Sequence, residues 1–380
     1  MATPEAGGDP VNTEDIDVVV IGGGQAGLAA GYYLRRAGHR FVILDDQPTP
    51  GGAWPHTWAS LTLFSPASYS SLPGWPMPNW PNGFPPARHV IDYLRAYEQR
   101  YELPVHRPVH VDEVIRDGEH LVVMTSAGQW RARAVISATG TWHQPFWPIY
   151  PGARDFGGQQ LHTVHYRDAA PFAGKHVVVV GGGNSAAHLL AEISETTTTT
   201  WVTHTPPRFL PDDVDGRALF DIATRRAADL AAGRPDTGGI ASLGDIVMVP
   251  PVLAARERGV LYAVPMFEGL TVDGVYWADH EQPADVIVWA TGFRPALAHL
   301  RPLHLREPDG TIAVDGTRAV KEPALHLLGY GDWTGPGSAT LIGVGRTARA
   351  AVDELFPHNR GLEQPSNSDQ VAGPRTRPNG

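Results

Sequence analysis

A glycine-rich turn near the N-terminus has the spacing of a nucleotide-binding loop. Gly22, Gly24 and Gly27 form a G-x-G-x-x-G pattern between the apolar residues IDVVVI and a stretch with helical spacing. The first glycine permits a tight turn, the second lets the backbone approach a diphosphate, and the third lets helix and strand pack closely. Gln25 and Ala26 stand at the helix N-terminus, whose free N–H groups favour an anion. The pattern predicts a dinucleotide site; the alternative is an ordinary glycine-rich turn.

An acidic residue stands at the end of the next apolar stretch, FVIL. An acid about 20 residues after the first glycine hydrogen-bonds the ribose hydroxyls of the nucleotide in such sites. Asp45 stands at this position and is the first candidate, with Asp46 as the second. The glycines alone are a weak signal, but strand, turn, helix and acid together predict the site with much greater specificity.

A second copy of the pattern begins at residue 181. Gly181, Gly183 and Ala186 give G-x-G-x-x-A after the apolar residues HVVVV, and Asn184 and Ser185 stand at the start of the expected helix. Alanine is tolerated at the third position of this motif. The sequence therefore predicts a second dinucleotide site.

The strand after the second motif, TWVTH, ends without a carboxylate. A carboxylate there would repel a 2′-phosphate, whereas a nearby arginine would attract one. Arg208 is the closest arginine, and His204 and Thr205 are possible hydrogen-bond donors. These residues favour NADP over NAD, although Arg208 also fits a solvated loop arginine.

Two dinucleotide sites in one chain indicate electron transfer between two nucleotides, usually a bound flavin and a diffusing nicotinamide. The 380-residue chain has no cysteine, which excludes disulfides, thiolate metal sites and an active-site dithiol. The formal net charge of −10 argues against a nucleic-acid surface. No basic segment precedes an apolar run at the N-terminus, and no apolar run reaches the ~18 residues that span a bilayer. We expect a cytoplasmic protein without a metal site.

The elements that position these motifs alternate between strands and helices. The fold class we predict is α/β, with two Rossmann-like dinucleotide-binding domains, the second inserted into the first. Between the motifs, the Trp- and Pro-rich stretch 54–86 is expected to be a long ordered loop. The predicted division is an outer domain in two parts, an inserted domain between them, and two disordered tails, at residues 15–155 and 286–360, 156–285, and 1–14 and 362–380.

With these residues in place, the sequence resembles the two-domain flavoproteins of the glutathione-reductase type, and within them the flavin-containing (class B) monooxygenases. The family's spacing from acid to GGxW appears as Asp45 followed by Gly51, Gly52 and Trp54. Its linker signature F-x-G-x-x-x-H-x-x-x-Y is matched at the residues Phe156, Gly158, His162 and Tyr166. The length and the stretches SLTLFSP and FLPDDVDG are most similar to small bacterial members found in arsenic-resistance operons.

The resemblance also implies further cofactor contacts. Two ATG stretches are typical of the family and contain Thr139, Gly140, Thr291 and Gly292. Asp332 would bind the ribityl chain or the diphosphate of FAD. A helix starting around Ser338–Leu341, with Thr340 and Leu341 at its N-terminus, would favour the negative charge of reduced flavin. The Trp54, Trp58, Trp75 and Trp80 side chains would together keep water out of the pocket, or simply pack a proline-rich loop.

The implied reaction is an FAD-dependent, NADPH-consuming monooxygenation. NADPH reduces the flavin, dioxygen forms a C4a-hydroperoxide, and one oxygen atom passes to a soft nucleophile (N, S or As) or a carbonyl. Many relatives carry an asparagine beside the flavin where this chain has Phe64, so the residue that stabilises the peroxide is unassigned. Ser65, Asn79 and His162 are the candidates for a catalytic polar group.

Two other functions fit the same motifs. An NAD(P)H oxidase or reductase without oxygen transfer gains support from the missing asparagine, and a non-catalytic flavin- or nucleotide-binding protein is the third reading. The absence of cysteine excludes a thiol–disulfide reductase. The partners we expect are a small-molecule substrate and O2, without nucleic acid or membrane, and the substrate and a homo-oligomeric state are left open.

Overall fold

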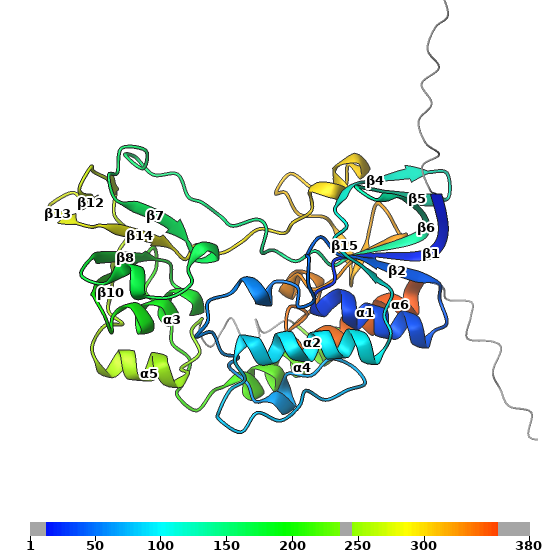
Figure 1. The fold of residues 1–380 in the computed structure, drawn as a ribbon, viewed down its shortest axis with the longest axis horizontal. Helices are drawn as coiled ribbons and strands as arrows, with labels where there is room; N and C mark the ends of the chain where they lie inside the picture. Colours follow the sequence, from blue (N-terminus) through cyan, green and yellow to red (C-terminus); the bar gives the residue numbers. More distant parts are fainter. Residues whose placement is uncertain (1–12, 236–244, 356–380) are drawn as a thin grey trace, which may run out of the picture.

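The computed structural model describes residues 13–235 and 245–355. Figure 1 shows two sheets side by side, each accompanied by helices, with two extended segments crossing between them. The first sheet contains strands from both ends of the described chain, and the second is built from its middle. The predicted α/β class with two Rossmann-like halves is confirmed.

Nine described strands form the first sheet, in the order β15-β16-β17-β6-β1-β2-β3, with the β4–β5 hairpin attached to β6. The parallel core consists of β17, β6, β1, β2 and β3. The strands are β1 (Thr13–Ile21), β2 (Phe41–Leu44), β3 (Val105–His106), β4 (Val111–Asp117), β5 (His120–Thr125), β6 (Gly128–Ser137), β15 (Val314–Asp315), β16 (Arg318–Ala319) and β17 (Leu325–Leu327).

Alternate side chains of β1 enter two different cores, because successive residues of a strand point to opposite faces. Val18 and Val20 pack under the helices α1 (Gln25–Arg36), α2 (Ala87–Arg100) and α6 (Val344–Leu355), whereas Val19 and Ile21 pack against the β4–β5 hairpin. The central strand is therefore apolar on both faces, as parallel strands are.

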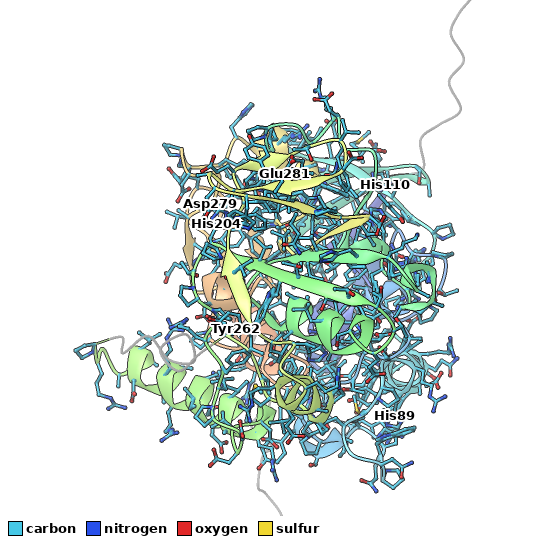
Figure 2. All side chains as sticks on the ribbon, turned by 90° about the vertical axis from the view of Figure 1, so that its left-hand side faces the viewer. His89, His110, His204, Tyr262, Asp279 and Glu281 are labelled. Atoms are coloured by element: carbon cyan, nitrogen blue, oxygen red, sulfur yellow. The ribbon has the colours of Figure 1, made fainter. Side chains whose placement is uncertain are left out.

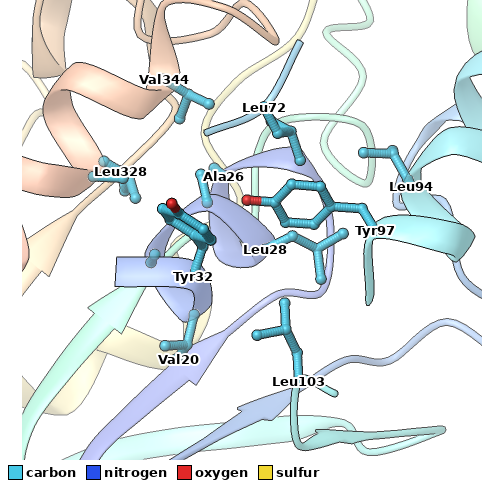
Figure 3. Close-up of a cluster of buried hydrophobic side chains, with 14 of the residues drawn as sticks. Val20, Ala26, Leu28, Tyr32, Leu72, Leu94, Tyr97, Leu103, Leu328 and Val344 are labelled. Carbon is cyan, nitrogen blue, oxygen red and sulfur yellow. The ribbon is translucent and has the colours of Figure 1, made fainter. Parts of the chain in front are cut away.

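The helical core joins the first glycine turn to the loop 54–86. Figure 3 shows Leu28 and Tyr32 of α1 near Tyr97 of α2. The α2 tyrosines hold the loop: Tyr97 donates to the Pro73 carbonyl at 2.6 Å, and Tyr93 donates to the Trp75 carbonyl at 2.7 Å. The loop contains two short 3-10 turns, at Trp54–His56 and Ala67–Tyr69. It is ordered without long regular elements, as predicted.

The second sheet has the order β10-β9-β8-β14-β7, all parallel. A small antiparallel sheet, β11-β12-β13, follows in the same half, and two helices accompany these sheets. A third helix, residues 216–231, instead contacts Tyr69 of the loop 54–86 and Asp332 of the first half. The elements are β7 (Gln159–His162), β8 (His176–Val180), α3 (Asn184–Ile193), β9 (Thr198–Thr203), α4 (Gly216–Ala231), α5 (Pro250–Glu257), β10 (Ala263–Pro265), β11 (Gly269–Leu270), β12 (Gly274–Tyr276), β13 (Glu281–Pro283) and β14 (Val286–Trp289).

Three expectations differ from the structure or lie outside it. Residues 13 and 14 belong to β1, where they pair with Gln129 and Trp130, so the expected N-terminal tail is wrong there; its remainder and the C-terminal tail 362–380 lie outside the described residues. Helix α6 begins at Val344 rather than around Ser338–Leu341, because hydrogen-bonded turns of Gly337 and Thr340 occupy that stretch.

The return from the second half to the first occurs after β14. This strand lies between β8 and β7, although the boundary at residue 286 assigns it to the outer domain. We propose that the boundary between the inserted domain and the second part of the outer domain falls after Trp289 instead. The other boundaries stay a prediction.

Candidate functional site

A cavity of about 460 Å³ opens at the carboxyl ends of the first sheet's parallel strands. It is bounded by the first glycine turn, the GGxW loop, the start of β4 and the first ATG stretch. Ligands of open α/β sheets bind at this edge. The predicted cofactor residues that line it are Gly22, Gly24, Gln25, Ala26, Asp45, Asp46, Gly52, Trp54, Thr139 and Gly140.

The first glycine turn has the geometry of a diphosphate cradle. Gly22 has φ +106°, and a Cβ there would lie 2.5 Å from the Ala138 carbonyl oxygen. A Cβ on Gly27 would lie 1.9 Å from the Gly22 carbonyl oxygen, so helix and turn require glycine at both positions. Helix α1 has no side-chain cap and no acidic residue in its first turn. Its N–H groups can therefore receive an anion.

The GGxW loop packs directly on this turn. Gly52 has φ +58°, and a Cβ there would lie 2.7 Å from Gly24 Cα. The Trp54 indole donates to Gln25 Oε1 at 3.3 Å, and the Gln25 amide donates to the Ala339 carbonyl at 2.7 Å. Gln25 thus joins the loop, α1 and the segment before α6 around one end of the cavity.

The two acidic candidates behind the turn have different surroundings. Asp45 is buried and accepts a hydrogen bond from Arg107 Nε at 2.6 Å. Asp46 is exposed and accepts one from the Gln47 amide at 2.6 Å. Burial raises the pKa of Asp45, and the Arg107 guanidinium acts in the opposite direction. The sequence did not indicate Arg107, since no motif places an arginine there.

The two ATG threonines make equivalent contacts. Thr139 Oγ1 donates to the Ala296 carbonyl at 2.8 Å, and Thr291 Oγ1 donates to the Phe146 carbonyl at 2.5 Å. Thr139, in the first crossing segment, thus holds the second crossing segment, and Thr291, in the second, holds the first. Backbone hydrogen bonds Ala296 N→Gly140 O and Phe146 N→Gly292 O, both 2.9 Å, complete the pairing. Thr139 and Thr291 therefore build the connection between the halves, besides lining the two cavities.

Buried polar groups behind the first ATG stretch were missed by the sequence reasoning. Tyr330 OH lies 2.8 Å from Thr139 Oγ1 and 3.1 Å from Ser137 Oγ, which in turn lies 3.1 Å from His299 Nε2. Burial lowers the pKa of His299 to about 4, so this cavity-lining imidazole is neutral at pH 7. These residues meet only through folding, because up to 193 positions separate them.

A second cavity of about 290 Å³ opens at the second glycine turn. Gly181 has φ +139°, and a Cβ there would lie 2.3 Å from the Ala290 carbonyl oxygen. Helix α3 begins after Gly183 without a side-chain cap, so its N–H groups are also open to an anion. The cavity is lined by Phe146, Pro148, Tyr150, Val180, Gly181, Gly182, Thr203, His204, Thr205, Ala290 and Thr291.

His204 and Arg208 separate in the structure. His204 lines the second cavity, with its Nε2 3.1 Å from Tyr150 OH. Figure 2, in which the second half faces the viewer, shows His204 near the left edge of the molecule. Arg208 does not line it; its guanidinium donates twice to Asp245, at 2.9 and 2.8 Å. Asn184 is occupied in a similar way, because its amide bonds Asp245 O and Val247 N. Ser185 and Ala186 lie at the start of α3.

His162 of the linker signature has a positioning role. Its Nε2 lies 3.0 Å from the Gly292 carbonyl and must donate, while its Nδ1 accepts from Val164 N at 3.2 Å. Burial lowers its pKa, so the imidazole is neutral. A Cβ on Gly158 would lie 2.4 Å from the Asp285 carbonyl oxygen, and Tyr166 is buried against Phe172. The signature therefore fastens the second half to the crossing segments.

Several other predicted residues lie outside the two cavity linings. Ser65 bonds Ser70 at 2.9 Å, Asn79 is exposed, and the Asp332 carboxylate pairs with Arg226 of α4 at 2.5 Å. Thr340 bonds the Gly337 carbonyl, and Leu341 packs in the helical core. Of the four tryptophans expected at the pocket, only Trp54 lines the first cavity, so the alternative of packing applies to the others: Trp58 is in the second half's core, and Trp75 and Trp80 contact Tyr93 and His89.

Within the described ranges 13–235 and 245–355, no helix is long and apolar enough to cross a membrane. No group of three or more histidine, aspartate or glutamate side chains there is placed to hold a metal ion.

Known proteins match this chain along most of its length. The flavin-containing monooxygenase from Stenotrophomonas maltophilia is 53% identical, with a TM-score of 0.82 over 90% of this chain and 98% of that chain. The uncharacterized oxidoreductase CzcO-like of Geobacillus kaustophilus (strain HTA426) is 30% identical over 90% of this chain and 99% of its own length. The indole-3-pyruvate monooxygenase YUCCA4 of Oryza sativa subsp. japonica is 27% identical, over 97% and 94%.

Residues 19–215 match the family described as pyridine nucleotide-disulphide oxidoreductase, a range that contains both glycine turns. This match and the 53% identity to a solved flavin-containing monooxygenase confirm the resemblance that the linker signature and the GGxW spacing indicated. The chain therefore belongs to the flavin-containing monooxygenases within the pyridine nucleotide-disulphide oxidoreductase family.

Proposed function

We propose that this protein is an FAD- and NADPH-dependent monooxygenase that transfers one oxygen atom from O2 to a small molecule. The observation that carries the proposal is the pair of cavities, each at a glycine turn with an uncapped helix N-terminus, in a chain 53% identical to a flavin-containing monooxygenase. We assign FAD to the first cavity and NADPH to the second. Bound FAD supplies electron transfer from the nicotinamide to dioxygen and the oxygen transfer itself.

The residues proposed for binding follow from this assignment. The turn from Gly22 to Gly27 would hold the FAD diphosphate at the N-terminus of α1, and Gln25 would fix that helix to the GGxW loop. The turn from Gly181 to Ala186 would hold the NADPH diphosphate at α3. His204 and Thr205 are the proposed contacts for the adenosine end of NADPH.

Proton transfer is not assigned to His162. A neutral imidazole that donates to a backbone carbonyl and accepts from a backbone N–H has no proton or lone pair left for a substrate. We propose that His162 keeps the two crossing segments in register, so that both cavities keep their relative position.

A second candidate function is an NADPH oxidase that releases hydrogen peroxide without oxygenating a substrate. It is favoured by Phe64, which stands where many relatives carry asparagine; the Phe64 backbone carbonyl accepts from Gly216 N at 2.7 Å. The Phe64 side chain packs against the core of the second half and does not line the first cavity, so it offers no hydrogen bond to a peroxide formed there.

Isotope labelling separates the two candidates. The flavin-loaded protein is supplied with NADPH and ¹⁸O2, and amines, thioethers, ketones and trivalent arsenicals are tested as substrates. A monooxygenase puts one ¹⁸O into product for each NADPH consumed with at least one of these classes. Peroxide formation equal to NADPH consumption with every class would contradict the proposal. A cytoplasmic location and the oligomeric state stay predictions.

A further inference from the structure

We propose that helix α4 is a clasp: a helix of the second half that closes over the first half, holds one wall of the first cavity in place and so slows the exchange of FAD. The effect on FAD rests on the proposed assignment of FAD to that cavity. By sequence α4 lies between β9 and α5 of the second half, and none of its described residues lines either cavity. Its side chains instead connect the two halves.

The first turns of α4 join the core of the second half to the Trp- and Pro-rich loop of the first half. Leu219 is buried in that core. The Gly216 N–H donates to the Phe64 carbonyl at 2.7 Å, and the Phe220 ring contacts Tyr69 at 6.4 Å between ring centroids. Figure 1 shows α4 beside this loop, below α2. The N-terminal end of the helix is therefore anchored to both halves.

The following turns of α4 rest on the segment between β17 and α6. Ala223 Cβ lies 3.4 Å from the place of a Cβ on Gly337. One turn further, Arg226 Nη1 donates to Asp332 Oδ2 at 2.5 Å, and the Arg226 side chain is only 17% exposed. Separating such a pair leaves a partly desolvated charge without this partner, so the pair favours the docked position of the helix.

The segment that α4 contacts is also a wall of the first cavity. The Thr340 N–H donates to the Gly337 carbonyl at 3.0 Å and closes a turn. Within this turn, Ala339 lines the cavity, and its carbonyl accepts from the Gln25 amide at 2.7 Å. One residue of the turn thus faces the cavity while another contacts α4. A dinucleotide that leaves by this wall displaces the turn, and the turn moves freely only when α4 lifts.

Helix α4 is held lightly enough to lift. Three of its 16 residues are buried, against eight of 12 in α1 and six of 10 in α3. Its contact with α6 is an exposed hydrogen bond of 3.0 Å from Arg346 Nη2 to Thr224 Oγ1. Segments with few buried contacts open at a lower free energy than the core of a protein. The clasp therefore opens without unfolding either half.

The absence of cysteine from the chain allows the clasp to be locked by one engineered disulfide. A223C and G337C are combined, because the two Cβ atoms would lie 3.4 Å apart, close to the ~3.8 Å of a disulfide. The double variant is loaded with radiolabelled FAD, oxidised with diamide or kept reduced, and chased with unlabelled FAD. The oxidised form is expected to release FAD at least ~10-fold more slowly, because the opening that limits release is blocked.

The reduced form is the matched control, since it carries the same two substitutions and the same backbone strain at Gly337. Thiol titration verifies that the disulfide has formed. Equal release rates from the oxidised and reduced forms overturn the proposal.

A second pair of variants decides the question if the disulfide does not form. R226A removes the ion pair with Asp332 and is expected to release FAD about five-fold faster than wild type. R225A, at an exposed position of the same helix, is expected to release FAD at the wild-type rate. Release from R226A at or below the wild-type rate overturns the proposal, as does equal acceleration in R225A. A protein that takes up no FAD contradicts the proposed function instead, so the two failures are distinguishable.

Discussion

In the second cavity, the His204 side chain is placed to influence the choice between NADPH and NADH. His204 is the only histidine among its lining residues, which include no arginine, lysine, aspartate or glutamate. Arg208, the arginine expected from the sequence to attract a 2′-phosphate, forms an ion pair with Asp245 on the surface. The 2′-phosphate of NADPH would therefore meet an imidazole and threonine hydroxyls in place of a fixed charge.

Two substitutions test this arrangement. R208A is expected to change the KM for NADPH by less than about five-fold, because it breaks only an exposed ion pair with Asp245. H204R places a permanent charge at the cavity and is expected to raise the preference for NADPH over NADH about 10-fold. The measurement is kcat/KM for both nucleotides at pH 8. A large loss of NADPH preference in R208A would show that the ion pair opens and that this arginine reaches the phosphate.

Sequence reasoning at the residue scale succeeded where backbone geometry dictates the residue type. Gly22, Gly27 and Gly181 are required because a Cβ would collide with a backbone carbonyl, and such requirements leave a fixed spacing in the sequence. The ion pairs of Asp45 with Arg107 and of Arg208 with Asp245 leave no spacing, because their partners come from distant segments. The sequence therefore predicted the two glycine turns at which the cavities open, but not which polar side chains there are engaged in ion pairs.

At the scale of elements, the connection between the two halves is built twice from the same parts. Each ATG stretch ends a strand, and its threonine donates to a carbonyl of the other crossing segment. Trp142 stacks on Phe293 at 5.4 Å between ring centroids, and His162 contacts Phe293 at 5.0 Å. The duplication visible in the sequence thus forms a connection in which each copy holds the other.

The close contact between the GGxW loop and the glycine turn before α1 can be tested by substitution. G52A is expected to weaken FAD binding at least ~10-fold, because its Cβ would lie 2.7 Å from Gly24 Cα and φ is +58°. G174A has the same kind of strain, with φ +75°, but no atom within 4 Å of the new Cβ. It should cost about 1 kcal/mol of stability and leave FAD affinity unchanged. Equal FAD affinity in both variants would show that the close approach does not shape the cradle.

The elements themselves were predictable to the extent that local pattern decides them. Strands β1 and β8 and the helices after them follow from apolar runs and glycine turns. The partner strands of β14 do not, because sheet order depends on contacts far along the chain. Helix α6 starts late because the Gly337–Thr340 turn competes with helix formation, which the hydrophobic spacing does not record.

Across the whole molecule, both halves contain histidines whose pKa is lowered by burial. Burial lowers the pKa of His188 on α3, of His299 at the first cavity and of His326 on β17, each to about 4. His326 is 1% exposed, its Nδ1 lies 2.9 Å from Thr317 Oγ1, and its Nε2 has no hydrogen-bond partner in the structure. At these positions the protonated, positively charged imidazole is unfavourable in the folded protein.

This burial makes the fold sensitive to mild acid. Unfolded histidines have a pKa near 6.5 and the folded ones about 4, so between these values the unfolded chain binds more protons and stability falls as the pH falls. Each such histidine contributes up to about 1.4 kcal/mol per pH unit in this window. The melting temperature of the apo-protein should therefore fall between pH 7.5 and pH 5. H326L should lower stability at pH 7.5 but flatten this slope. An unchanged slope in H326L would mean that folding does not lower the pKa of His326, which its burial and single hydroxyl partner argue against.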